Sequence, residues 1–403
     1  MAYFQDLCAQ FRRFPTAIRY FYLTDMLFAF SVSIFGTLFN LHLLSIGYTA
    51  DHVGQLQAVS AILMAAVAIP IGLTGDRWNR RTLYIAGSLF FGLPYIVLPW
   101  VSQFPVLMAV QAMSALGHTL MQVNESGILA GEVDARQRAS VFSFMMINFF
   151  VWQTVATQLA GFLADWLPAG PSTVYQWPLV IAGVCGVVSG IGRALLPFRK
   201  QEPVGRRLNL RPSRITVKLA LAAILSSVAM SLTMHFSNVI LASRFGYPAS
   251  TISTVLMVAG TLGWLGSLLV PWSSSRIGNM RGAVTMIGLQ GFALMAMGLA
   301  GQPVGFLPAF WSRAILGNMQ ASLWMAFVMD VTAEDERATA QAYIICARSI
   351  GTAAAARGFG AALAAGSFVL PFTVASLFAF ATAAFIFFTF RKQALTATAV
   401  VRA

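Results

Sequence analysis

The feature that most constrains this chain is a succession of long apolar stretches that runs along nearly all of its 403 residues. About 20 consecutive apolar residues in an α-helix cross the hydrocarbon core of a bilayer. Hydrophobic residues make up 58% of the sequence and charged residues only 10%, whereas a soluble domain carries about 25% charged residues. The composition therefore excludes a soluble globular fold and predicts an all-α membrane protein.

The apolar stretches number twelve, and short turn-like segments separate most of them. We predict membrane helices over residues 19–45, 52–75, 82–101, 105–131, 139–166, 177–198, 215–243, 250–272, 282–301, 305–331, 338–365 and 371–390. The segment 199–214 is basic, polar and proline-containing, and it divides the helices six and six. We therefore predict two six-helix bundles, over residues 1–198 and 215–403, joined by a cytoplasmic linker over 199–214.

The distribution of positive charge predicts the orientation in the membrane. The chain has 26 Lys and Arg against 13 Asp and Glu, a net charge of +13. With a cytoplasmic N-terminus, nearly all the Lys and Arg residues fall on the cytoplasmic side, Arg193 among them, and only Arg244 falls outside. Membrane proteins show this bias, so we expect both termini in the cytoplasm and no nucleic-acid partner.

Residues typical of metal or catalytic sites are sparse. The three cysteines (Cys8, Cys185 and Cys346) are far apart, and the four histidines form no metal-binding motif. The sequence shows no nucleophile–base set and no nucleotide-binding loop. We therefore expect no metal, no cofactor and no enzymatic activity.

The two halves repeat a pattern. Gly117 precedes Arg138 by about the same spacing as Gly317 precedes Arg337, and each arginine opens the following predicted helix. Internal repetition around a central linker is expected of transporters in which one half rocks against the other.

The loop between the second and third predicted helices carries a motif, Gly72-Leu-Thr-Gly-Asp76-Arg77-Trp-Asn-Arg80-Arg81. Together with the six-plus-six plan, this motif resembles the loop signature of the major facilitator superfamily. The resemblance implies a gating role for Gly72, Asp76, Arg77, Arg80 and Arg81. In physical terms, the arginines of this loop can pair with Glu132 and Asp134 of the next cytoplasmic loop, as a latch that breaks when this side opens.

Ionisable residues inside membrane helices are costly, and they are functional candidates by default. In the first half these are Asp25 and Glu125, and His118 lies seven residues before Glu125 on nearly the same helix face. In the resembled family the first and fourth helices line one central cavity, which implies that both acids share it. Two carboxylates in a partly dry chamber suit reversible proton binding, so we assign proton coupling to these three residues.

The second half carries arginines inside its predicted helices instead: Arg313, Arg348 and Arg357. Buried arginines need carboxylates, phosphates, carbonyl oxygens or aromatic faces. They can pair with first-half acids, bind an anionic or electron-rich substrate, or bond helix carbonyls. We assign substrate binding to the three arginines and to the polar side chains of His235, Asn238 and Asn40.

The leading hypothesis is a secondary transporter that works by alternating access and exports an amphipathic small molecule in exchange for protons. The export direction is implied by resemblance to bacterial efflux members, which also implies a place in the bacterial inner membrane. The alternatives are proton-coupled uptake of an organic anion, and a membrane receptor or lipid-handling protein on the same fold. The expected partners are a small-molecule substrate, protons and the lipid bilayer, and we expect a monomer.

Overall fold

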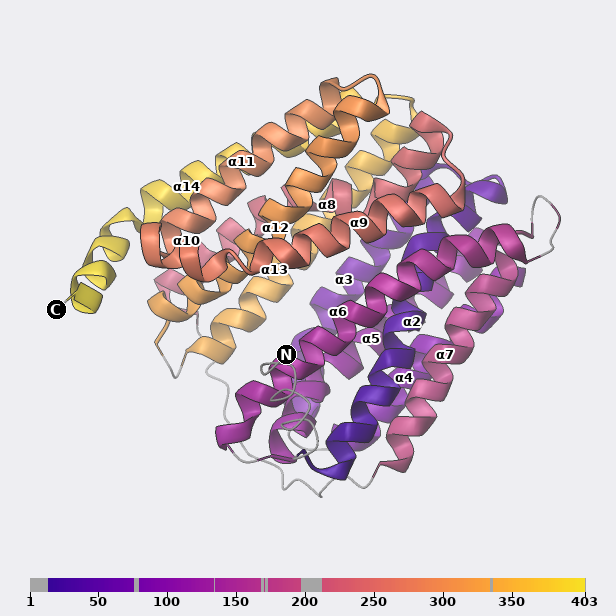
Figure 1. Cartoon of the computed structure of the whole chain (residues 1–403), viewed down its shortest axis with the longest axis horizontal. Helices are drawn as coiled ribbons and strands as arrows, with labels where there is room; N and C mark the ends of the chain where they lie inside the picture. The colour runs from indigo at the N-terminus through magenta and orange to yellow at the C-terminus, as the bar shows by residue number, and fades with distance from the viewer. Residues whose placement is uncertain are drawn as a thin grey trace, which may run out of the picture. The chain divides into compact units, whose positions relative to one another are not determined.

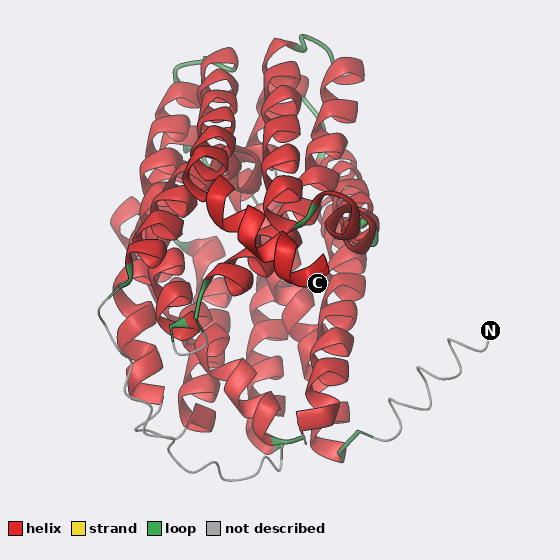
Figure 2. Ribbon diagram, turned by 90° about the vertical axis from the view of Figure 1, so that its left-hand side faces the viewer, coloured by secondary structure: helices red, strands yellow, loops and turns green. Residues whose placement is uncertain are grey.

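The computed structural model describes residues 14–75, 80–133, 135–167, 170, 173–196, 212–333 and 336–402. Within these residues the chain is helical, the connections are short, and no strand is formed (Figure 2). The all-α fold class is therefore confirmed.

The helices follow one another along the chain as labelled in Figure 1. Their bounds are α2 (Thr16–Ser45), α3 (Ala50–Gly75), α4 (Arg80–Val97), η1 (Leu98–Trp100), α5 (Phe104–Gly131), α6 (Ala135–Trp166), α7 (Gln176–Leu195), α8 (Arg214–Phe245), α9 (Ala249–Ser267), α10 (Val270–Ile277), α11 (Asn279–Leu299), α12 (Pro303–Val331), α13 (Arg337–Ala364) and α14 (Val369–Arg402).

Each of the twelve predicted spans coincides with a helix or with two consecutive helices. Among the described residues, ten helices are long and apolar enough to cross a membrane. The other two predicted spans correspond to α3 and α13, which are helical over the predicted ranges. The predicted span 250–272 is divided, because α9 ends at Ser267 and α10 starts again with Pro271 in its first turn, where proline is tolerated.

Local sequence sets the ends of individual helices. Ser213 caps α8, and its side chain accepts a hydrogen bond from the Thr216 backbone amide at 3.2 Å. Gly246 ends α8 in the left-handed region at φ 65°, a conformation that glycine adopts without strain. Proline in the first turn opens α5 and α12, where its missing N–H has no partner to lose.

The chain divides into two compact units, each with its own packing. The first comprises Met1–His42 and Ala66–Arg206, and the second comprises Leu43–Ala65 and Arg207–Ala403. The division after Arg206 falls inside the predicted linker. The segment 43–65, which holds the first part of α3, belongs to the second unit although it precedes that unit in the sequence.

Helix packing in the first unit depends on small residues. There α4 packs against both α5 and α7. A Cβ atom added to Gly117 of α5 would lie 2.6 Å from the Gly87 carbonyl oxygen of α4, so only glycine permits this approach. In the second unit α11 packs against α12 and α14, α8 against α13 and α14, and α9 against α12.

Candidate functional site

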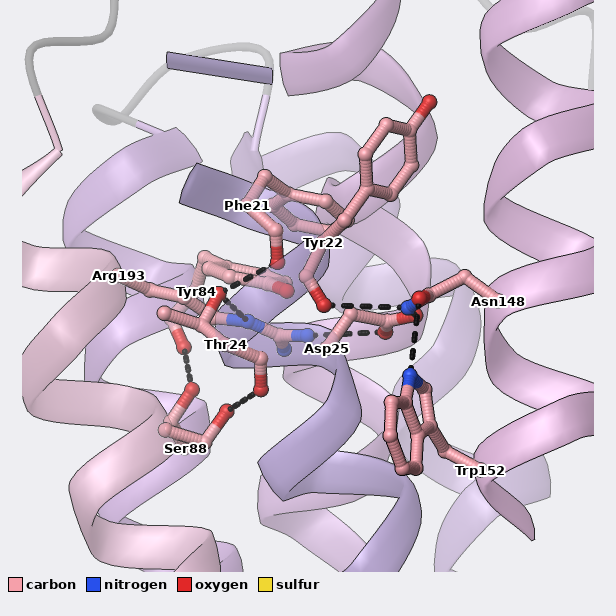
Figure 3. A network of polar contacts seen from close by, with 10 residues as sticks. Phe21, Tyr22, Thr24, Asp25, Tyr84, Ser88, Asn148, Trp152 and Arg193 are labelled. Atoms are coloured by element: carbon pink, nitrogen blue, oxygen red, sulfur yellow. Dashed lines mark hydrogen bonds and ion pairs between the residues drawn. The ribbon is translucent and has the colours of Figure 1, made fainter. Parts of the chain in front are cut away.

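A buried ion pair lies in the first unit. Asp25 of α2 pairs with Arg193 of α7 at 3.1 Å between Oδ1 and Nη2, and the two side chains are 2% and 0% exposed. The other carboxylate oxygen of Asp25 accepts a hydrogen bond from Asn148 Nδ2 of α6 at 3.1 Å. Trp152 Nε1 donates to Asn148 Oδ1 at 3.2 Å and so fixes the amide (Figure 3). Three helices thus converge on one carboxylate.

Aromatic rings surround the Arg193 guanidinium. Its central carbon lies 4.8 Å from the ring centre of Phe21, 5.1 Å from that of Phe28 and 5.0 Å from that of Tyr84. Its Nε donates to Thr24 Oγ1 at 3.3 Å (Figure 3). A guanidinium stacks on aromatic faces as well as pairing with carboxylates, so rings and acid together offset part of the loss of water around Arg193. Its Nη1 is buried and has no hydrogen-bond partner among the described residues.

The contact between α2 and α7 puts Arg193 in register with Asp25. Ser189, one turn before Arg193, donates to the Thr24 carbonyl oxygen at 2.7 Å. Gly192 faces the same threonine, since an added Cβ would lie 2.8 Å from Thr24 Cγ2. Small residues on this face of α7 let its backbone approach α2 closely, and the long arginine side chain then reaches the carboxylate.

Glu125 and His118 of α5 lie around the same cluster. Glu125 is half-buried and interacts electrostatically with Arg193 and Asp25, and no described residue forms a hydrogen bond with it. The His118 ring lies 6.4 Å from the Phe28 ring at an interplanar angle of 16°, in a stacked arrangement. The structure therefore brings the three predicted proton-coupling residues to one region of the first unit.

The charges of this cluster do not cancel. With both carboxylates ionised, Asp25 and Glu125 carry two negative charges against the single positive charge of Arg193. Burying an uncompensated charge is costly. Uptake of one proton by either acid would make the cluster neutral.

Two polar residues of this site escaped the sequence analysis. The charge distribution placed Arg193 on the cytoplasmic side, but the structure buries it completely. The signal was present, because Arg193 lies within the predicted span 177–198 and not in the linker. Asn148 carried no such signal, since a lone amide in a membrane helix is common in ordinary packing.

The predicted loop motif is described only in part. Asp76 and Arg77 lie outside the described residues. Gly72 and Arg80 are described only by their place at the ends of α3 and α4. Arg81 is described, and its Nη2 donates to the Ala194 carbonyl oxygen of α7 at 2.6 Å. Glu132 is buried, whereas Asp134 lies outside the described residues. The latch between this loop and the two acids stays a prediction.

In the second unit, Arg348 of α13 lines a cavity of about 130 Å³. Other residues in its wall are Ser226, Met230, Gln320, Trp324 and Met325. Arg313 lies seven residues before Gln320, on the same face of α12. Its Nε is buried and has no hydrogen-bond partner among the described residues.

The other predicted substrate residues lie elsewhere. His235 and Asn238 are on α8 and Asn40 is on α2, and none of them lines the Arg348 cavity. Asn238 is buried, and its Oδ1 accepts a hydrogen bond from the Val239 backbone amide at 2.9 Å. Their role in substrate binding stays a prediction.

Arg357 has a carboxylate partner near the start of α3. It forms an ion pair with Asp51, and the two side chains are 54% and 26% exposed. Pairing with an acid from the first half of the sequence was one of the alternatives left open for these arginines. Arg357 therefore differs from Arg348, for which no carboxylate partner is found among the described residues.

Replacing Asp51 with asparagine is expected to lower the free energy of unfolding by less than about 1 kcal/mol, because exposed ion pairs contribute little. Thermal unfolding of the purified variant in nonionic detergent measures the effect. Arg357→Gln should give the same small loss. A large loss from either variant would show that this pair is not an ordinary exposed one.

Ten described helices that are long and apolar enough to cross a membrane, together with the charge cluster buried in the first unit, define a multi-pass helical membrane protein. The family model of the Major Facilitator Superfamily matches residues 21–356. Because this match covers most of the chain, the protein belongs to the Major Facilitator Superfamily. It is therefore a transporter and not an enzyme.

Solved structures share the fold at low sequence identity. A bacterial homolog of the human lysosomal transporter Spinster, in an inward-facing and occupied conformation, has a TM-score of 0.75 at 16% identity over 93% of this chain and 96% of its own. The nucleoside transporter NupG has a TM-score of 0.73 at 14% identity over 92% of this chain and 98% of its own. No curated protein matches the chain in sequence.

Proposed function

We propose that this protein exports an amphipathic small molecule across the bacterial inner membrane in exchange for protons, as a monomer with both termini in the cytoplasm. The observation that supports proton coupling best is the placement of Asp25 and Glu125 around one buried guanidinium, Arg193. Two acids and one base in a membrane helix bundle form a site whose net charge one proton cancels. The export direction follows the resemblance of the loop motif to bacterial efflux members.

Glu125 is the acid that takes up the transported proton. Asp25 is held by Arg193 and Asn148, whereas Glu125 is attracted to Arg193 without a described hydrogen bond. When Glu125 is ionised it draws α5 towards Arg193 on α7, and when it is protonated that attraction is lost. A charge change that favours one helix arrangement over another shifts the conformational population, and this shift couples the proton to transport.

Alternating access requires a helix contact that can part. The first part of α3 packs along α13 through Ala58, Ala61 and Ala353, and the exposed Asp51–Arg357 pair lies at one end of this contact. Contacts of small residues hold few interlocking side chains, and an exposed ion pair is weak. We assign this contact to the outer side, where it closes the transporter and separates when that side opens.

Replacing Glu125 with glutamine is expected to abolish the dependence of transport on a pH gradient, because glutamine cannot exchange the proton. The substrate is first selected by a thermal-shift screen of amphipathic compounds on the purified protein, since a ligand of the folded state raises its stability. Its flux is then followed in proteoliposomes with and without an acidic exterior. The wild-type protein should release trapped compound faster when the exterior is acidic. Glu125→Gln should release it at the same rate with and without the acidic exterior.

The control is Asp165→Asn, which removes an exposed carboxylate at the end of α6 and should transport like wild type. If the compound instead accumulates inside when the exterior is acidic, the protein takes up its substrate together with protons, and the proposed export direction is wrong. Wild-type flux that ignores the gradient, together with normal flux in Glu125→Gln, would rule out proton coupling through this cluster.

A further inference from the structure

The cavity beside Arg348 lies among α8, α11, α12, α13 and α14 of the second unit. Its wall combines one cation with two small polar groups, Ser226 and Gln320, and with the apolar side chains of Met230 and Trp324. Arg348 and the wall residue Ala321 are exposed, so the cavity reaches the surface of the unit at these residues. A ligand pocket has this composition, with mostly apolar walls and a few polar groups that fix orientation.

No carboxylate in the part of the chain that the structure describes compensates the positive charge of the cavity. Between described residues, the ion pairs are Asp25–Arg193 and Asp51–Arg357, and neither involves Arg348. Arg348 has no carboxylate and no hydrogen-bond acceptor among the described residues. A guanidinium binds carboxylate groups bidentately and strongly, so an anionic group in this cavity would find an available partner.

The size of the cavity limits the ligand. Its volume is about 130 Å³, and an apolar cavity of about 150 Å³ in another protein holds one benzene ring. Drug-sized ligands need about 300–1,000 Å³. The cavity therefore fits one aromatic ring or a short alkyl chain. Met230, Met325 and Trp324 supply adaptable and aromatic surface for that apolar part.

We propose that this cavity binds a small organic monocarboxylate with one ring or an equivalent short chain, its carboxylate on Arg348 and its apolar part against Trp324 and the two methionines. The proposal rests on the transport function proposed above and names the substrate class for it. Arg313 lies on the same face of α12 as Gln320 and Trp324, about two turns before Gln320, and adds positive charge to that face of the helix.

The test uses benzoate as the probe, with benzyl alcohol and benzylammonium as its neutral and cationic counterparts. Binding to the purified full-length protein in nonionic detergent is measured by thermal shift and by tryptophan fluorescence. Benzoate should raise the melting temperature in a saturable way, and its two counterparts should not do so at the same concentration. Arg348→Gln should weaken benzoate binding by about ten- to hundredfold, as expected for the loss of a charge-assisted contact.

Two further variants separate charge from shape. Arg348→Lys keeps the positive charge and should retain part of the affinity, and Ala321→Phe fills the cavity from an exposed position and should abolish binding with Arg348 intact. Arg276→Gln removes an exposed arginine on α10 and should bind benzoate like wild type. If Ala321→Phe does not fold, the comparison of Arg348→Gln with Arg348→Lys still shows whether benzoate binding depends on the positive charge at this position.

The proposal is overturned if benzoate fails to bind, if benzyl alcohol binds as well as benzoate, or if Arg348→Gln and Ala321→Phe bind benzoate normally. These outcomes are distinct from failure of the proposed transport cycle. If benzoate does not bind but the flux of another compound depends on the pH gradient, the proposal of proton coupling stands and only the proposed substrate class is wrong. If benzoate binding depends on Arg348 but flux does not depend on the pH gradient, the proposed binding site stands and the proposed proton coupling is wrong.

Discussion

Replacing Arg193 with glutamine is expected to lower the free energy of unfolding by about 3–5 kcal/mol, the cost of leaving a buried charge without its partner. Among the described residues, only Asn148 would still donate a hydrogen bond to the buried Asp25 carboxylate. Glu125 would lose the same counter-charge. The loss should appear as a large fall in the melting temperature of the purified protein in nonionic detergent.

The double variant Asp25→Asn/Arg193→Gln should recover the part of this stability that the unpaired Asp25 carboxylate costs, although Glu125 still lacks the charge of Arg193. Removing both charges together leaves two neutral amides, and replacing a buried ion pair by uncharged groups is often neutral. The control is Arg276→Gln, because Arg276 is exposed on α10 and its guanidinium lies over the Trp272 ring, away from any described carboxylate partner. If Arg193→Gln is no more destabilising than this control, the buried pair does not stabilise the fold in the way described.

The helices could be predicted closely from the sequence, and the physical reason is simple. In a membrane every backbone polar group needs an internal partner, so an apolar stretch of about 20 residues is confined to a helix. The span 250–272 shows where this reasoning fails. Its apolarity continues past Ser267, but Pro271 supplies no N–H to the helix, and a second helix starts there.

Only the acidic residues of the buried cluster could be predicted from the sequence. Asp25 and Glu125 stood out because a carboxylate inside an apolar stretch is costly. Arg193 did not, because it is close to the basic linker, and a predicted helix end is uncertain by several residues. Over that interval, an arginine that orients the chain and one that is buried in the bundle look the same in a single sequence.

Long-range pairings were out of reach for a different reason. Asp51 and Arg357 are 306 positions apart, and no local pattern links them. The packing of α3 along α13 decides which arginine of the second half pairs with an acid. No local sequence pattern contains that information. The structure separates the two cases, since Arg357 has Asp51 whereas Arg348 lines a cavity.

Replacing Gly54 with leucine is expected to force α3 and α13 apart and to stop transport. A Cβ atom at Gly54 would overlap the Ala356 carbonyl oxygen, and one at Gly360 would lie 2.7 Å from the Ala50 carbonyl oxygen. These neighbours are backbone atoms, so they cannot move aside as a flexible side chain does. Overpacking costs about 1–3 kcal/mol where neighbours can adjust, and here the two helices have to separate instead.

Cys346 of α13 reports on this contact directly. Its thiol donates to the Ala65 carbonyl oxygen of α3 at 3.5 Å, so separation of the helices should expose it. In a background with Cys8 and Cys185 replaced by serine, Gly54→Leu should raise the rate of maleimide labelling of Cys346 and eliminate flux in proteoliposomes.

The matched control is Gly358→Leu, because Gly358 lies on the same helix as Cys346 and nothing occupies the space around an added Cβ atom. This variant should label and transport like wild type, which separates the effect of a larger side chain from its effect at the contact. Wild-type labelling and flux in Gly54→Leu would contradict a close α3–α13 contact. Increased labelling with normal flux would show instead that the contact forms but that transport does not depend on its closure.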